Sequence, residues 1–388
     1  MIVRQFLQWQ RTACAAERAD ATSALARAYL YSDLTPDDRA AAEGALLMLL
    51  DDPSPLVRAA LAQALATSED APPNVVLALA GDQPEIARPI LEQSPLLLDA
   101  DLVDAVATQG GPAQLAIASR VHLPPAVSAA IAEVGSPEAC LVLVENAQAA
   151  IAPFSFDRIV ERFGHLGAIR EAMLARPDVP ASTRQGLVAK LSQTLAGFVA
   201  ARAWLQPDRA QRIAKEACEK ATVILAAVSP GEEIRPLVRH LRESGQLNAG
   251  LVLRALLSGN IDLFVQALAD LAELPHIRVS ALVHDRHGTG FRALYRKAGL
   301  PESVYPAFHA ALEAMREGGY AGSQRGATNL KRRMVERVLT RCADGPPGEI
   351  EPLLTLLRRF AAEAAREEAR MFCDELIADA DEEARVAA

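Results

Sequence analysis

The N-terminal half of the chain repeats a short pattern of apolar residues spaced three and four apart. In four successive copies, the equivalent apolar position is occupied by Leu79, Val106, Ile131 and Val160. These copies lie 27, 25 and 29 residues apart, and a further copy runs from Pro180 to Leu191. Apolar spacing of three and four is typical of a helix with one buried face. The pattern predicts a stack of short helix pairs, each of which buries its apolar face against the next.

Two of the predicted helices begin with the same motif. Residues 52–58 read DPSPLVR, and residues 82–88, thirty residues later, read DQPEIAR. Proline suits the first helical turn because its missing N–H would have no partner there, and the aspartate can cap free amides. This motif is typical of HEAT-like repeats, and we expect each arginine to reach an acidic residue of a neighbouring repeat. It predicts an α-solenoid of short HEAT-like helix pairs followed by a C-terminal helical region.

The helical pattern lengthens beyond Ser192. Further helices are predicted at residues 194–204, 208–227, 232–243, 247–257, 260–273, 275–284, 290–298 and 302–317. A glycine-rich stretch at 318–328 then precedes two more helices, at about 328–343 and 348–380. The sequence therefore predicts three domains, which are a repeat stack with an N-terminal cap (1–194), a continuing helical domain (195–318) and a helical hairpin (319–388).

Composition favours an all-α fold. Alanine and leucine dominate and aromatic residues make up only 4% of the chain, which suits packed helices better than sheets. The net charge of −9 is unevenly placed, because residues 1–194 hold 14 basic and 23 acidic residues while residues 195–388 hold 26 of each. An acidic N-terminal half repels phosphate backbones, so we predict no nucleic-acid partner.

Cysteine usage and apolar run lengths bear on location. The five cysteines lie far apart without a CxxC pair, which predicts free thiols in a reducing cytosol. The first residues lack the apolar run of a signal peptide, and the longest apolar stretches fall short of the roughly 18 residues that a membrane span needs. We expect a cytoplasmic protein with no membrane span, no metal and no cofactor.

Two stretches of the second half carry a family resemblance. Residues 251–264 read LVLRALLSGNIDLF, and residues 283–301 read VHDRHGTGFRALYRKAGLP. They resemble the core of a bacterial family of helical proteins known as domain of unknown function 2336, and the motif at 52–58 is similar to that family's N-terminal half. The resemblance implies an all-helical repeat fold over most of the chain and supplies no catalytic residue.

The densest cluster of polar side chains falls within this family motif. The candidate ligand-binding or partner-binding residues are His284, Asp285, Arg286, His287, Arg292, Arg296 and Lys297. Residues 286–290 predict a tight turn before a helix, whose free N–H groups can hold a phosphate or a carboxylate. In the structural alternative, the glycines serve the turn, His284 packs in the core and the basic residues are solvated. A metal site is disfavoured, because His284 and His287 have only Asp285 as a nearby third ligand.

A second basic cluster lies near the helix predicted at 328–343. It consists of Arg325, Lys331, Arg332, Arg333, Arg337 and Arg341. These side chains can pair with acidic residues of the last helix, which are Glu363, Glu367, Glu368 and Asp374. The alternative is an anionic partner, but Tyr320 is the one aromatic residue nearby, and single strands need a larger stacking surface.

No cluster has the spacing of a catalytic site, so we expect a non-enzymatic scaffold that binds another protein or a peptide on its helical surface. The alternatives are a sensor for a small anionic ligand or second messenger at the turn, and a HEAT-like DNA glycosylase, which the acidic N-terminal half disfavours. A HEAT-like lyase that attaches chromophores has no supporting residue. The apolar stripe of the helix predicted at 348–380 also predicts a homodimer.

Overall fold

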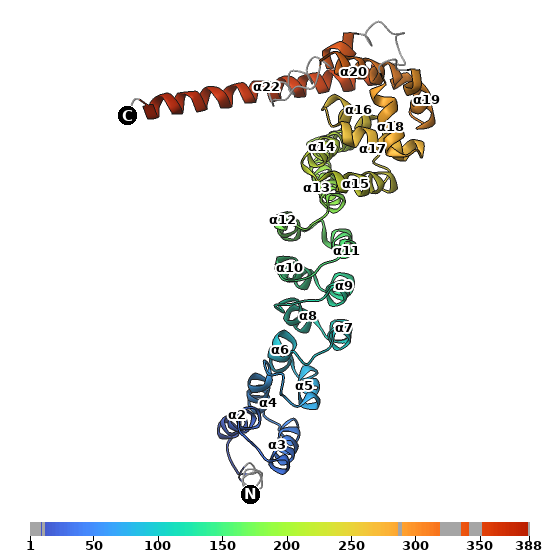
Figure 1. Ribbon diagram of the computed structural model, residues 1–388. Helices are drawn as coiled ribbons and strands as arrows, with labels where there is room; N and C mark the ends of the chain where they lie inside the picture. Colours follow the sequence, from blue (N-terminus) through green and yellow to red (C-terminus); the bar gives the residue numbers. More distant parts are fainter. Residues whose placement is uncertain (1–8, 10–11, 286–288, 319–334, 341–350, 387–388) are drawn as a thin grey trace. The chain divides into compact units, whose positions relative to one another are not determined.

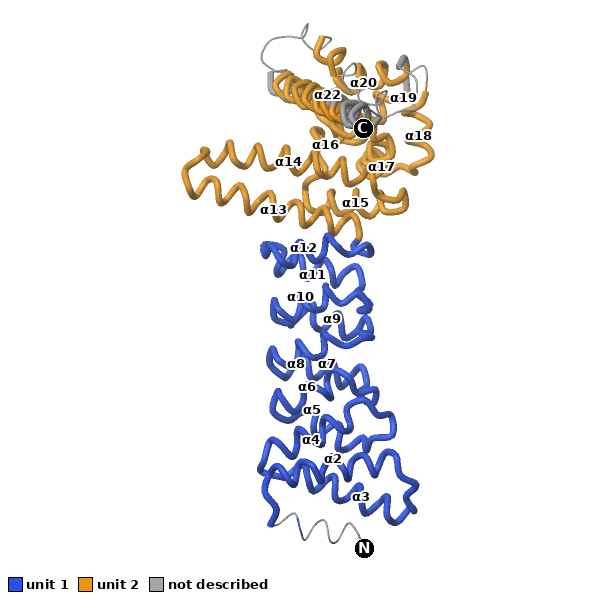
Figure 2. Tube along the Cα trace, turned by 90° about the vertical axis from the view of Figure 1, so that its left-hand side faces the viewer, with its two compact units in different colours: residues 1–179 blue, residues 180–388 orange. Residues whose placement is uncertain are grey.

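The computed structural model describes residue 9 and residues 12–285, 289–318, 335–340 and 351–386. Their secondary structure is helical, apart from one isolated β-bridge between Leu123 and Ala149. The all-α prediction is therefore confirmed. The chain divides into two compact units, residues 1–179 and residues 180–388 (Figure 2).

The first unit consists of short helices (Figure 1). They are α2 (Ala15–Tyr31), α3 (Pro36–Leu49), α4 (Pro55–Leu65), α5 (Pro73–Ala80), α6 (Pro84–Gln93), α7 (Asp99–Thr108), α8 (Gly111–Ala118), α9 (Pro125–Val134), α10 (Pro137–Glu145), α11 (Pro153–Phe163) and α12 (Gly167–Ala175). Seven of these eleven helices begin with proline. Proline is compatible with the first helical turn and disfavours helical backbone in the residue before it, so each proline separates its helix from the preceding one.

The helices of the first unit contact one another in two rows. Each even-numbered helix from α2 to α12 contacts the next even-numbered one, while α7, α9 and α11 form successive contacts in the other row. The four equivalent apolar positions of the repeat are all buried in this unit, and they are Leu79, Val106, Ile131 and Val160. The predicted apolar register is thus the one that forms the core.

Polar side chains link successive helices of the even-numbered row. Arg120 follows α8, Asn146 is the C-cap of α10 and Arg176 is the C-cap of α12. Each donates to carbonyl oxygens at the C-terminal end of the preceding helix in the row. Arg120 donates to those of Leu91 and Ser94 at 2.7 and 2.8 Å, and Asn146 to those of Ala118 and Arg120 at 3.0 and 2.7 Å. Arg176 donates to those of Val144 and Asn146 at 3.1 and 2.8 Å. We call these three links the carbonyl ladder. They give partners to carbonyl groups that a helix end leaves without any.

Ion pairs link the first helices of the same row. Arg58 of the first motif binds Asp82 of the second with two hydrogen bonds, 2.7 Å from Nε and 3.2 Å from Nη2, as the motif predicted. Arg88 of the second motif instead pairs with Glu92 of its own helix at 3.6 Å. The prediction is wrong at Arg88 because residues 108–113, around the start of α8, read TQGGPA and offer no carboxylate.

The second unit contains longer helices. They are α13 (Ala181–Ala201), α14 (Pro207–Val228), α15 (Gly231–Glu243), α16 (Ala249–Leu257), α17 (Ile261–Ala272), α18 (His276–His284), α19 (Thr289–Lys297), the 3-10 turn η1 (Glu302–Val304), α20 (Tyr305–Gly318) and α22 (Glu351–Val386). Helices α13 and α14 lie side by side as a hairpin that extends away from α15 and α16 (Figure 2).

The predicted boundary at residue 194 falls inside α13. The sequence suggested a last repeat helix up to Leu191 and a new helix from residue 194, but residues 181–201 form one continuous helix. No proline interrupts residues 181–201, so the helix continues through the expected break. The division between the two units comes before α13, at residues 179 and 180.

The core of the second unit draws on distant parts of the sequence. All residues from Leu251 to Leu257 in α16 are buried, and Phe264 of α17 stacks on Phe308 of α20. Leu357 and Phe360 of α22 belong to the same core. The described part of the predicted hairpin at 319–388 thus shares a core with residues 223–314, whereas most of its first helix lies outside the described residues. Among the described residues, no helix combines the length and the apolar character needed to cross a membrane.

Candidate functional site

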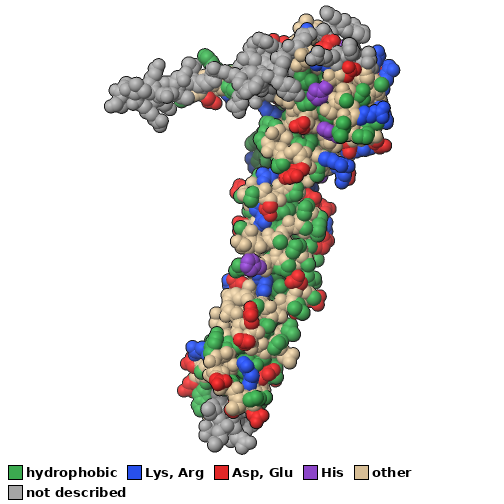
Figure 3. Space-filling model, in the orientation of Figure 1, with side chains coloured by type: hydrophobic (Ala, Val, Ile, Leu, Met, Phe, Trp, Pro, Cys, Tyr) green, Lys and Arg blue, Asp and Glu red, His purple; other side chains and the backbone are tan. Residues whose placement is uncertain are grey.

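The predicted binding turn lies between α18 and α19. Arg286 and His287 are outside the described residues, and Asp285 is the C-cap of α18. His284 is exposed rather than buried in the core, and its Nδ1 lies 2.8 Å from the carbonyl oxygen of Ser280. Figure 3 shows Lys and Arg side chains at the edge of the second unit that α18 and α19 form, where Lys297 is among the exposed residues.

The two arginines of α19 are both engaged within the unit. The guanidinium of Arg292 lies over the ring of Tyr305 at 5.3 Å, and Arg296 forms an ion pair with Glu302 at 2.5 Å. A Cβ atom on Gly290 would lie 2.5 Å from Cδ2 of Leu282, so this glycine lets α19 approach α18. The close packing at Gly290 fits the structural alternative for the turn, whereas the two engaged arginines and the exposed His284 differ from what that alternative expected.

His284 lies on a cavity that does not include these arginines. Together with His276 and Ser280 of α18, it lines a space of about 390 Å³ against the turns before α15 and α17. Neither Arg292 nor Arg296 is among the lining residues. This cavity therefore does not unite His284 with the two arginines, and no group of three metal-binding side chains is found in the described part of the chain.

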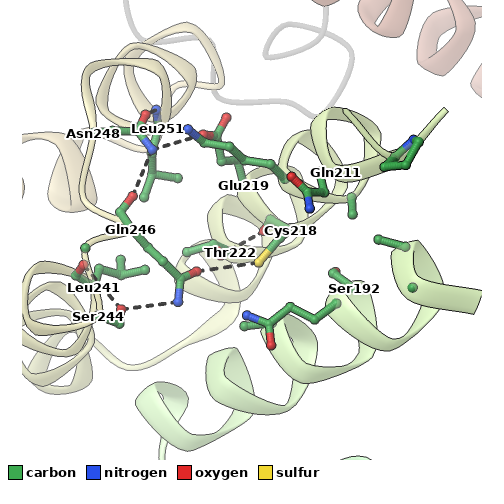
Figure 4. A pocket seen from close by; sticks show the side chains of 18 of the residues that line it. Ser192, Gln211, Cys218, Glu219, Thr222, Leu241, Ser244, Gln246, Asn248 and Leu251 are labelled. Carbon is green, nitrogen blue, oxygen red and sulfur yellow. Dashed lines mark hydrogen bonds between the residues drawn. The ribbon is translucent and has the colours of Figure 1, made fainter. Parts of the chain in front are cut away.

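A larger cavity, of about 640 Å³, lies between α13, α14 and the turn from α15 to α16 (Figure 4). Its walls are mainly small side chains. The lining residues that matter for its chemistry are Ala196, Gly197, Lys215, Cys218, Glu219 and Asn248. None of the residues that line it is aromatic.

Glu219 and Asn248 are the polar centre of this cavity. Glu219 of α14 is only 8% exposed, and its Oε1 accepts a hydrogen bond of 3.1 Å from Nδ2 of Asn248. The same Nδ2 donates to the carbonyl oxygen of Gln246 at 3.1 Å, while Oδ1 of Asn248 caps α16 by accepting from the N–H of Leu251 at 3.0 Å. Figure 4 shows how these bonds hold Asn248 against α14. Asn248 is thereby fixed as a positioning group for the carboxyl of Glu219.

Burial raises the pKa values of two side chains of α14, Glu219 and Cys218. It raises the pKa of Glu219 above its ordinary value, and the hydrogen bond from Asn248 and the charges of Lys215 and Arg254 counter it only in part. Burial also raises the pKa of the Cys218 thiol. Since the thiolate is the reactive form of cysteine, burial lowers the reactivity of Cys218.

A network of hydrogen bonds around Gln185 closes one end of the cavity. Gln185 of α13 is fully buried, and its Nε2 donates to Oε1 of Gln246 at 2.7 Å. The Oε1 of Gln185 lies 3.0 Å from Nε2 of His240. The hydroxyl of Thr222 donates to the carbonyl oxygen of Cys218 at 2.8 Å. Nε2 of Gln185 also donates to the hydroxyl oxygen of Thr222 at 3.5 Å, so the bonds of Gln185 join α13 to α14 and to α15.

The sequence contained one unused signal for this site. Glu219 stands three, four and seven residues before Thr222, Val223 and Ala226, which are all buried. This spacing puts the carboxyl group on the apolar face of α14. A charged residue on the apolar face of an amphipathic helix is rare unless it is paired or functional, and that feature would have pointed to Glu219.

The described structure is thus all-helical, and its larger cavity lies beside the hairpin of α13 and α14. A family model described as "Uncharacterised protein conserved in bacteria (DUF2336)" matches residues 86–347, and the chain belongs to this family. The match includes the stretches 251–264 and 283–301 that suggested it, whereas the motif at 52–58 lies outside it. Comparison with curated proteins and with solved structures gave no match.

Proposed function

We propose that residues 15–179 form an α-solenoid of short HEAT-like helix pairs and that the chain is a non-enzymatic, cytoplasmic scaffold for another protein. Contacts between every second helix and the repeated links of the carbonyl ladder support the solenoid. Structures built this way present long surfaces on which a partner segment can lie.

One surface feature carries the scaffold proposal. At the end of α13, Phe198 and Trp204 are 45% and 63% exposed, with ring centroids 5.8 Å apart in an edge-to-face arrangement. The guanidinium of Arg202 lies 4.1 Å from the Phe198 ring centroid. Leu195 and Leu191 extend this exposed strip one and two turns back along α13. Tryptophan and arginine are enriched among the residues that dominate binding energy in protein interfaces, so this strip is the surface where we place the partner.

Changing Phe198 and Trp204 together to alanine is expected to abolish capture of the partner, because the main apolar anchors are lost. Both side chains are exposed, so the melting temperature should stay within about 2 °C of the wild type. The measurement is cross-linking and affinity recovery from cytosol, quantified by mass spectrometry. Ile277→Ala is the matched control, since Ile277 is 83% exposed elsewhere in the same unit. Equal recovery by the double variant and the control would contradict the proposal.

The scaffold is further proposed to be a homodimer through α22. Leu357, Phe360 and Ala364 anchor this helix in the core, but no described side chain after Ala364 is buried, and Phe372 and Ile377 are both exposed. A 36-residue helix is about 54 Å long, and an isolated helical extension is only marginally stable in water. A second copy of the same exposed stripe is the partner that this arrangement fits.

Changing Phe372 and Ile377 to aspartate is expected to convert the dimer into a monomer, because charges are costly in an apolar helix interface. Light scattering at tens of micromolar protein measures the mass of each form. Ile277→Asp is the control and should remain dimeric. A wild-type protein that is already monomeric at these concentrations would rule the dimer out.

A further inference from the structure

We infer that the cavity between α13 and α14 binds a small aliphatic amino acid, with the ligand's ammonium group on Glu219 and its carboxylate on Lys215. This site is separate from the exposed strip at the end of α13 to which we assign the partner. The inference stands whether or not the scaffold proposal is correct.

The buried carboxyl group of Glu219 is incompletely paired. Its Oε1 accepts from Asn248, while no second hydrogen bond and no ion pair to this carboxyl group is found among the described residues. Asn248 cannot neutralise it, because an amide carries no charge, and its Nδ2 and Oδ1 are also engaged by Gln246 and by the N–H of Leu251. The charges of Lys215 and Arg254 offset its burial only in part, and a buried carboxylate without a direct ion pair is costly for the fold. A ligand ammonium is the group that would complete this pairing.

Lys215 provides a positive charge at the same cavity. It lines the same cavity and lies one helical turn before Glu219 on α14, which places both side chains on one face. Lys215 is exposed and has no ion-pair partner among the described residues. The two residues are about 6 Å apart along the helix axis, and a cation on the same face as the buried carboxyl repels a diamine and attracts a carboxylate. The two charges together therefore favour a zwitterion.

The walls of the cavity consist mainly of small side chains. Ala189, Ala196, Ala200 and Ala214 line the space with single methyl groups, and a Cβ atom on Gly197 would meet no atom within 4 Å. The absence of aromatic lining leaves a nucleobase without a stacking surface. Small apolar walls instead fit an unbranched or lightly branched aliphatic chain, because such contact removes methylene groups from water.

The raised pKa of Glu219 agrees with this geometry. A group whose folded pKa is raised favours the folded state most at low pH, and this contribution is lost as the pH rises through the folded pKa. A bound ammonium group would lower the pKa of Glu219 again, because a nearby positive charge favours the carboxylate. Glu219→Gln removes the titration, so at pH 7–8 the ligand-free variant should melt at the wild-type temperature or a few degrees above it.

The test is a thermal-shift series on the full chain with four probes: 5-aminopentanoate, L-norvaline, n-pentylamine and pentanoate. At a hundred times its dissociation constant, one of the two amino acids should raise the melting temperature of the second unit by about 5–10 °C. The amine should give a smaller shift, and pentanoate none. The inference is overturned if neither amino acid shifts the melting temperature, or if pentanoate alone does.

Variants identify the site of any binding. Glu219→Gln should weaken binding of the amino acid at least tenfold, and Gly197→Leu should block it by filling the cavity without disturbing the fold. Lys215→Gln should weaken binding of the amino acid but not of n-pentylamine. Glu243→Gln, on an exposed carboxylate at the end of α15, is the matched control. Unchanged affinity in both Glu219→Gln and Gly197→Leu would overturn the inference even if the wild type binds.

Discussion

Replacing Arg176 with methionine is expected to lower the free energy of unfolding by about 3 kcal/mol. Arg176 is 9% exposed. Its guanidinium donates to the carbonyl oxygens of Val144, Asn146 and Ala149 at 3.1, 2.8 and 3.3 Å and pairs with Asp178 at 2.7 Å. Methionine keeps an unbranched apolar side chain but leaves these carbonyl oxygens without their donor, and each buried group left without a hydrogen-bond partner costs about 1–3 kcal/mol.

Urea denaturation followed by circular dichroism measures this loss. The control is Arg88→Met, because the side chain of Arg88 is 72% exposed and, within the described part of the chain, its ion pair is with Glu92 of its own helix. Such surface pairs contribute about 0.5 kcal/mol or less. If the two variants lose equal stability, the carbonyl ladder does not stabilise the stack.

The second large effect is expected at the anchor of α22. Arg254 of α16 is 5% exposed, pairs with Glu363 at 2.7 Å and lies 4.1 Å from the ring centroid of Phe360. Removing one member of a buried ion pair leaves the other charge uncompensated, which costs about 3–5 kcal/mol. We expect Arg254→Met and Glu363→Leu each to lose about 3 kcal/mol in urea denaturation.

The double variant separates pairing from packing. With both charges replaced by apolar groups, the stability should return to within about 1 kcal/mol of the wild type, because neither desolvated charge remains. Arg242→Gln, whose ion pairs with Asp270 and Glu273 are exposed, should lose less than about 1 kcal/mol. Additive losses in the double variant would show that the two residues act independently.

Apolar periodicity predicted most of the fold because burial and helix geometry both follow from it. Leu79, Val106 and Ile131 were aligned by spacing, and all three are fully buried. Proline at helix starts marked the breaks in the first unit. Where a break was inferred without proline, near residue 194, α13 continues. Local signals therefore locate helix starts well and locate domain boundaries poorly, since boundaries depend on which helices pack together.

The candidate site was less predictable. Clustering of charged residues pointed to the turn before α19, but Arg292 and Arg296 contact Tyr305 and Glu302 of the elements that follow. The larger cavity is lined from residues 189–251, and no local motif joins these parts. Such a site is formed by residues that are close together in the fold, whereas sequence analysis detects residues that are close together along the chain.

The carbonyl ladder also constrains how the length of the chain can change. Its links join residues 29, 28 and 32 positions apart, measured from Arg120 to Leu91, from Asn146 to Ala118 and from Arg176 to Val144. An insertion of a few residues inside a helix would move a donor away from its carbonyl groups, whereas adding or removing a whole helix pair would place the next donor on an equivalent helix end. The stack can therefore be lengthened or shortened in steps of one repeat, and the solvent-facing surface of the stack would grow or shrink by the same unit.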